Sequence, residues 1–145
     1  MRKFEKVSYD DTGIIPTRAD NASAGYDFYS PIDFEVKPNE NVMIKTNIKA
    51  QMGQDEVLLL FVRSSIGIKR HLALSNGTGV IDSSYYNNID NEGNIMCSLF
   101  NYGSQTQKIA KGERIMQGVF VKYLTTENDV VVNSSRKGGI GSSGK

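Results

Sequence analysis

Hydrophobic and polar residues alternate with a period close to two along most of the chain, which is the pattern of β-strands. Residues 42–48 follow this alternation and predict one half-buried strand. Residues 57–62 are apolar without interruption, which is typical of a strand buried on both faces. Residues 115–121 alternate again and predict a strand with two different faces, carrying Ile115, Val119 and Val121 on one and Met116 and Phe120 on the other.

Glycine, proline and asparagine recur between these runs at short intervals, as turn signals do. Long windows lack the helical spacing of apolar residues, and only residues 64–71 are compatible with a short helical turn. Many short strands with such punctuation predict an all-β sandwich or a barrel-like fold. The length of 145 residues fits one domain with a sizeable core.

Composition narrows the class of protein further. The chain carries 17 Lys and Arg against 16 Asp and Glu, a balance that argues against non-specific nucleic-acid binding. The single cysteine, Cys97, rules out an internal disulfide and fits a reducing compartment. No apolar signal-peptide segment stands at the amino terminus, and the apolar run 57–62 is too short to span a bilayer. We therefore expect a soluble, cytoplasmic protein with no nucleic-acid or membrane partner.

The segment 77–88 is the first candidate for a ligand site. Its two glycines let the backbone approach a ligand closely or adopt positive φ. An apolar pair then begins a strand that ends in the carboxylate of Asp82, and Tyr85 follows at the distance of one turn. A ligand pocket explains this pattern, but an ordinary Asp-Ser turn explains it as well.

The carboxyl-terminal residues 133–145 differ from the rest, because they are rich in glycine and serine. A frayed terminus is one explanation. The other is a tail that becomes ordered over a ligand, since glycine N–H groups, serine hydroxyls and Arg136 can surround an anion.

Five segments together resemble the trimeric dUTP pyrophosphatase (dUTPase) family, in the family's order and approximate spacing. They are Ala24–Phe28, Arg63–Gly67, Gly79–Asp82 with Tyr85, Gly112–Gln117 and Arg136–Gly144. The resemblance covers nearly the whole chain. It implies an all-β, jelly-roll-like (β-clip) subunit over residues 1–132 and a flexible tail over 133–145 that closes over an active site. It also implies a homotrimer with active sites shared between subunits.

The activity implied by the resemblance is hydrolysis of dUTP to dUMP and pyrophosphate. Asp82 would then be catalytic: it would deprotonate the water that attacks the α-phosphorus and hold the deoxyribose 3′-hydroxyl. A turn-capping carboxylate is its structural alternative. Tyr85 would pack flat on the sugar and leave no room for a 2′-hydroxyl, whereas core packing is its alternative. The uracil would be bound by Asn76, with the neighbouring Gly79, Val80, Ile81 and Met96 lining its pocket.

Phosphate contacts are implied for a second group of residues. Arg63, Ser64 and Ser65 would bind phosphates, although Arg63 also fits a structural ion pair. Gln117 stands among apolar neighbours, so its amide requires a partner, either an α-phosphate oxygen or a neighbouring strand. In the tail, the outer phosphates would be held by Arg136, Ser142 and Ser143, and the base would be covered by Ile140.

A triphosphate carries close to four negative charges, so a divalent cation is expected, and Mg²⁺ bound mainly through the substrate phosphates fits best. Asp27 matches the family carboxylate that reaches this ion through water. Asp27 also fits an ordinary position at the start of a strand. The sequence offers no His/Cys cluster for zinc.

Three departures from the family pattern mark where the site is least defined. The segment Tyr86–Gly93 replaces the usual Tyr-Arg-Gly-Glu-Ile continuation with a longer hairpin, Ser65 stands where glycine is common, and Ile140 replaces a phenylalanine. The hairpin is a possible contact surface for a protein partner, so a regulatory protein on a dUTPase scaffold is an alternative function. A dCTP deaminase shares the fold, but its differently placed glutamate has no counterpart near Val80–Tyr86.

Overall fold

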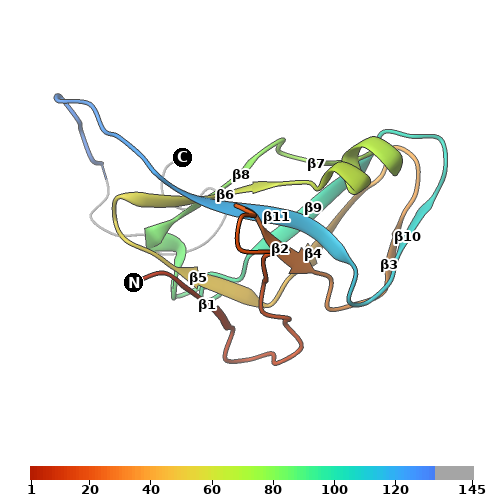
Figure 1. Cartoon of the computed structure of the whole chain (residues 1–145), viewed down its shortest axis with the longest axis horizontal. Coiled ribbons are helices and arrows are strands. Elements are labelled where there is room, and N and C mark those ends of the chain that lie inside the picture. Colours follow the sequence, from red (N-terminus) through yellow and green to blue (C-terminus); the bar gives the residue numbers. More distant parts are fainter. Residues whose placement is uncertain (133–145) are drawn as a thin grey trace.

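Short antiparallel strands carry the fold of residues 1–132, the part of the chain that this computed structural model describes (Figure 1). The strands are β1 (Lys3–Lys6), β2 (Tyr26–Tyr29), β3 (Phe34–Val36), β4 (Asn41–Lys45), β5 (Ile48–Gln51), β6 (Glu56–Phe61), β7 (Leu72–Leu74), β8 (Gly79–Asp82), β9 (Met96–Asn101), β10 (Gln107–Ile109) and β11 (Arg114–Lys122). Two helical turns join them: η1 (Ser65–Lys69) is a π-turn and η2 (Ser83–Tyr85) is a 3₁₀ turn.

The strands form four small sheets that enclose one apolar core. A four-stranded sheet has the order β2-β11-β6-β8, a three-stranded sheet has the order β4-β9-β7, and β1-β5 and β10-β3 form pairs. Side chains from all four sheets meet in a single cluster that includes the fully buried Phe28, Leu58, Leu72 and Leu99. The expected all-β, jelly-roll-like class is confirmed, because sheets packed face to face bury one side of each strand in this way.

The apolar run 57–62 predicts a strand buried on both faces, and strand β6 covers most of it, but its second face is only partly buried. It pairs with β11 along one edge and with β8 along the other. Leu58 and Leu60 face the core and are 0% and 2% exposed, whereas Phe61 at the strand's end is 36% exposed. The helical turn expected within 64–71 is also present, as η1 directly after this strand.

The predicted faces of 115–121 are wrong for one residue. A β-bulge shifts the register of β11 against β2 between Arg114 and Met116. Two successive residues, Ile115 and Met116, therefore both point into the core and are fully buried. Simple alternation predicts that Ile115 shares the face of Gln117. It does not, because a bulge adds one residue and reverses the faces beyond it.

The single strand expected over 42–48 is also wrong. Strand β4 ends at Lys45 and β5 begins at Ile48, and the two belong to different sheets. Asn47 adopts φ 60° between them, and its amide donates to Thr12 while its backbone N–H donates to Asn94. Thr46, Asn47 and Ile48 are all buried at this corner, so burial does not alternate there as the sequence pattern predicts.

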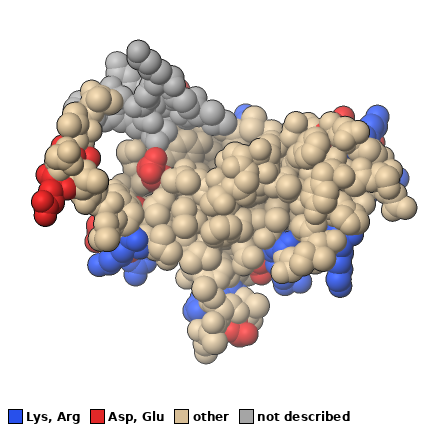
Figure 2. All heavy atoms as spheres, turned by 90° about the horizontal axis from the view of Figure 1, so that it is seen from above, with Lys and Arg blue, Asp and Glu red and all other residues tan. Residues whose placement is uncertain are grey.

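Charged side chains do not form a continuous basic surface on the face that Figure 2 shows. Lys and Arg lie in separate groups along its edge, and its wide centre carries no charge. Across residues 1–132, none of the helical turns is long and apolar enough to cross a bilayer.

Gly118 tests how tightly the central sheet is packed. A Cβ at this position would lie 2.9 Å from Leu58 Cδ1, 3.0 Å from Phe28 Cε1 and 3.1 Å from Leu60 Cδ2. Gly118→Ala is therefore expected to lower the free energy of unfolding by about 1–3 kcal/mol, as overpacking does. Denaturant unfolding measures this, and an unchanged midpoint would show that the core yields at this position.

Candidate active site

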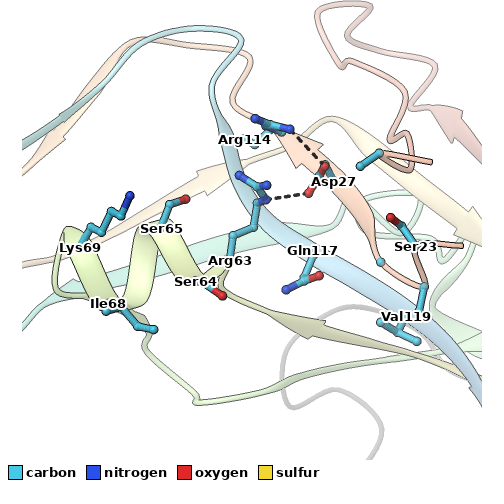
Figure 3. Close-up of a pocket in the computed structure, with 13 residues that line it drawn as sticks. Ser23, Asp27, Arg63, Ser64, Ser65, Ile68, Lys69, Arg114, Gln117 and Val119 are labelled. Carbon is cyan, nitrogen blue, oxygen red and sulfur yellow. Dashed lines mark ion pairs between the residues drawn. The ribbon is translucent and has the colours of Figure 1, made fainter.

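A pocket of about 820 Å³ opens beside the end of β6, where η1 and β11 meet. Its polar lining comes from β2, the β6–η1 junction and β11 (Figure 3). Its charged and polar lining residues include Asp27, Arg63, Ser64, Ser65, Lys69, Arg114 and Gln117. The predicted phosphate-binding residues Arg63, Ser64, Ser65 and Gln117 are thus brought together in one place.

Two arginines converge on Asp27 at the floor of this pocket (Figure 3). Arg63 Nε lies 2.9 Å from Asp27 Oδ1, and Arg114 Nη1 lies 3.8 Å from Asp27 Oδ2. Asp27 is only 7% exposed, so its charge requires such partners. The structural alternative for Arg63, an ion pair, is therefore present, and it holds the guanidinium at the pocket rather than away from it.

Gln117 faces this pocket from the middle of β11. It lies opposite Asp27 on β2 and opposite Phe61 on β6, so all three side chains share the outer face of the sheet. Gly25 lies against it, because a Cβ there would approach Gln117 Oε1 to 2.4 Å. Because Gly25 has no side chain, there is room for the Gln117 amide at its observed position.

Asp82 lies in a second region, at the end of β8. Strand β8 delivers it with an extended backbone, and the turn η2 begins at the next residue. Asp82 occupies the N-cap position of η2, and within the described chain its carboxylate makes no capping hydrogen bond to that turn. Tyr85 ends η2 with 8% exposure, and its hydroxyl donates to the Asn94 carbonyl over 2.7 Å.

The other residues predicted to bind the base lie along the same strand and the turn before it. Asn76 is exposed in the turn 75–78 between β7 and β8, where Gly77 adopts φ 76°. Val80 is 59% exposed, while Ile81 packs against the core. Gly79 has a packing reason of its own, since a Cβ there would lie 2.9 Å from Leu60. Met96 begins β9 and is half-buried.

The two regions do not meet within one chain. Asp82 pairs with Val57 near the start of β6, whereas Arg63 follows the other end of that strand. Six residues of extended chain separate these positions by about 20 Å. In Figure 1, the green end of β8 and the yellow-green turn η1 accordingly lie at opposite ends of β6. The predicted tail residues Arg136, Ile140, Ser142 and Ser143 lie outside the described residues.

Residues 1–132 contain no group of three or more His, Cys, Asp or Glu side chains arranged to hold a metal ion. Asp27 has both carboxylate oxygens engaged by arginine, so its geometry does not fit direct coordination. This arrangement fits an ion that is bound by substrate phosphates and water and not directly by the protein, which is how Mg²⁺ is commonly bound.

The segment expected to form a hairpin after β8 has another structure. Tyr86–Gly93 is a loop of consecutive turns without strand pairing, with Asn87, Glu92 and Gly93 at positive φ. Side chains of the loop bond to its own backbone, as in Asn88 Oδ1, which accepts from the N–H groups of Asp90 and Asn91. Such local bonds compete with a ladder and replace it.

Comparison with known proteins identifies the family. The dUTPase family model matches residues 11–144. The chain belongs to the dUTPase family. It is 42% identical to the deoxyuridine 5′-triphosphate nucleotidohydrolase of Lactococcus lactis, over 99% of this chain and 98% of that protein. The dUTPase from Streptococcus mutans has a similar structure, with a TM-score of 0.81 and 39% identity over 87% of this chain and 99% of that one.

The activity of the chain is therefore that of a dUTP nucleotidohydrolase, which is a dUTP diphosphatase. A dUTPase from phage phi11 of Staphylococcus aureus shares the fold at 22% identity and a TM-score of 0.75, over 92% of this chain and 98% of that one. That phage enzyme coordinates a structural Mg(II) ion.

Two contributors to the site were not predicted from the sequence. Arg114 lies inside the fourth family segment, but only the sheet register brings it to Asp27. Lys69 reaches the same pocket from η1. The sequence does show an arginine in strand β11 and a carboxylate in β2. Because of the bulge in β11, the pairing that brings these two side chains together could not be predicted from alternation.

Gly25→Ala tests whether Gln117 must keep its position. The new Cβ would displace a flexible amide end rather than backbone, so the fold should survive. We expect kcat/KM for dUTP to fall about 10–100-fold, because a misplaced contact is costly in a positioned site. Steady-state kinetics of the double variant with Gln117→Ala provide the control: it should match Gln117→Ala alone, and additive losses would contradict this role.

Proposed function

We propose that the chain hydrolyses dUTP at sites that two regions of different subunits complete together. The separation of the Asp82 region from the phosphate pocket by the length of β6 carries this proposal. A nucleotide placed against Asp82 of one chain would reach the pocket at Arg63 only on a neighbouring chain. A closed homotrimer supplies each chain with one such neighbour on either side.

Asp82 acts as the general base in this proposal. Its carboxylate takes a proton from water, whose oxygen bonds to the α-phosphorus. The bond between the α-phosphorus and the oxygen bridging to the β-phosphorus breaks, and pyrophosphate leaves with that oxygen. A carboxylate at the end of a paired strand is held firmly, which general-base catalysis requires.

The phosphate pocket supplies charge and directional donors. Arg63 and Arg114 are kept in place by Asp27, so they are oriented before substrate arrives. One carboxylate opposite two guanidinium groups leaves a net positive charge, to which Lys69 adds. Ser64, Ser65 and the Gln117 amide add neutral donors. Donors that are oriented in advance stabilise the charge that develops during phosphoryl chemistry.

The base and sugar would lie along β8. Within the described sheets β8 is an edge strand, so the outer backbone groups near Val80 and Ile81 are not used by another strand. With Asn76, they fit the donor and acceptor pattern of uracil, and cytosine presents the opposite pattern. Tyr85 covers the sugar, with Met96 nearby on the start of β9.

Two further elements complete the proposal. The tail predicted over residues 133–145 lies outside the described residues. In this proposal, Arg136, Ser142 and Ser143 would bind the phosphates and Ile140 would cover the base. Isoleucine excludes water from the base but lacks the aromatic stacking worth about 1–3 kcal/mol. Mg²⁺, when bound, supplies neutralisation of phosphate charge. The water-bridged role proposed for Asp27 is secondary to its pairing with the arginines.

Substrate choice and the role of Asp82 are tested in one assay. Pyrophosphate release is measured with Mg²⁺ and dUTP, dCTP, dTTP or UTP. At low nucleotide concentration we expect the wild type to turn over dUTP and none of the other three nucleotides. For Asp82→Asn we expect kcat for dUTP to fall at least about 100-fold. Undiminished turnover by that variant would refute the general base. Preference for dCTP with ammonia release would instead indicate a deaminase, and no turnover at all would favour a regulatory protein.

The sharing of sites between chains has its own test. Asp82→Asn and Arg63→Ala are each expected to be inactive as pure assemblies. Refolding an equal mixture should restore roughly a quarter of the wild-type sites, because mixed trimers then pair an intact Asp82 with an intact Arg63. If both regions acted within one chain, mixing would restore nothing. Light scattering on each preparation confirms that the variants still assemble.

A further inference from the structure

The loop 86–93 encloses the hydroxyl of Tyr85 in a buried amide cluster. The hydroxyl donates to the Asn94 carbonyl over 2.7 Å and accepts from Asn91 Nδ2 over 2.9 Å. Asn88 is 6% exposed, and its amide donates to the Tyr85 carbonyl over 2.8 Å. The loop therefore contacts both the backbone and the ring end of Tyr85.

The orientation of the Asn91 amide is determined by its own partners. Asn91 Oδ1 accepts from Asn88 Nδ2 over 2.7 Å and from the Gly93 N–H over 3.0 Å. With its oxygen used twice, the side chain has only its Nδ2 to offer the Tyr85 hydroxyl. The bond between Asn91 and Tyr85 is thus directional, and it is made by a donor.

The cluster is attached to the body of the subunit. Asn94 is fully buried and exchanges hydrogen bonds with Asn47 at the β4–β5 corner. Glu92 accepts from the Ser8 N–H over 2.9 Å. Gly93 adopts φ 90°, and a Cβ there would lie 2.6 Å from the Tyr85 carbonyl. A loop fixed at these points is a rigid support for the residue that it encloses.

We propose that Asn91 is a positioning residue for Tyr85, and that through it the loop 86–93 determines how strictly the enzyme excludes ribonucleotides. The proposal rests on the proposed function, in which Tyr85 packs on the sugar. A pocket that rejects an added hydroxyl by shape alone discriminates only if its wall does not move. Asn91 and the Asn94 carbonyl hold the far end of the ring from two sides.

This role accounts for the departure of residues 86–93 from the family pattern. A longer segment provides the turn at Asn88–Gly93 that carries the Asn91 amide back to the hydroxyl. The side of the loop that faces the subunit makes the contacts to Tyr85. At its tip, Ile89 is 86% exposed and takes no part in the cluster.

Asn91→Asp replaces the donor with an acceptor of the same shape. We expect the ratio of kcat/KM for dUTP to that for UTP to fall about 5–10-fold, as loss of one hydrogen bond does. The ratio should fall mainly because kcat/KM for UTP rises, and kcat for dUTP should change little. Asp90→Asn, the reverse exchange at the exposed neighbouring position, is the matched control and should leave the ratio unchanged.

A double-mutant cycle with Tyr85→Phe separates positioning from a general loss of stability. Once the hydroxyl is absent, Asn91→Asp should not lower the ratio further. Tyr85→Phe also tests the proposal alone if Asn91→Asp does not fold, because it removes the same bond from the other side. An unchanged ratio in either single variant, or additive losses in the double variant, would overturn the proposal.

A readout independent of catalysis distinguishes this proposal from the proposed function. With tyrosine isotopically labelled at Cζ, the Tyr85 resonance is assigned by its absence from Tyr85→Phe. It should shift in Asn91→Asp and stay in place in Asp90→Asn, and an unmoved resonance in Asn91→Asp would overturn the proposal. If the wild type releases no pyrophosphate from dUTP while the resonance shifts, the proposed function fails and the contact itself stands.

Discussion

The pairing of β6 along both of its edges is the constraint on which the rest of the structure depends. Because β11 and β8 flank it over nearly its full length, the ends of this strand cannot approach each other. One end leads to η1 and the arginine pocket, and the other lies beside Asp82. A strand holds its ends apart at a set distance. In the proposed function, this separation is the reason that a second chain is needed to complete each site.

Three charged side chains form a cluster beside the same strand. Asp27, Arg63 and Arg114 come from three different stretches of sequence and meet on the outer face of the sheet. A buried carboxylate would be unstable alone, and two arginines without a carboxylate would repel each other. Together they satisfy the buried carboxylate and leave positive charge at the pocket. A polyanionic substrate needs both the charge and the orientation.

Amide hydrogen bonds surround Tyr85 instead. Asparagine side chains around Tyr85 satisfy one another, and among the described residues no buried side-chain nitrogen or oxygen lacks a partner. A network that is fully satisfied is rigid, whereas a partly satisfied one is a source of instability. The loop 86–93, which departs from the family pattern, is therefore part of the architecture around Tyr85.

The β class, the apolar strand β6 and the family follow from local features of the sequence. Alternation and turn residues report which side chains are buried nearby, and motifs report chemistry that is local in the chain. Three other features could be read only from the folded chain. The bulge at Ile115, the corner at Asn47 and the arginines at Asp27 depend on register between distant strands. Register follows from how whole sheets pack, and a local pattern does not contain that information.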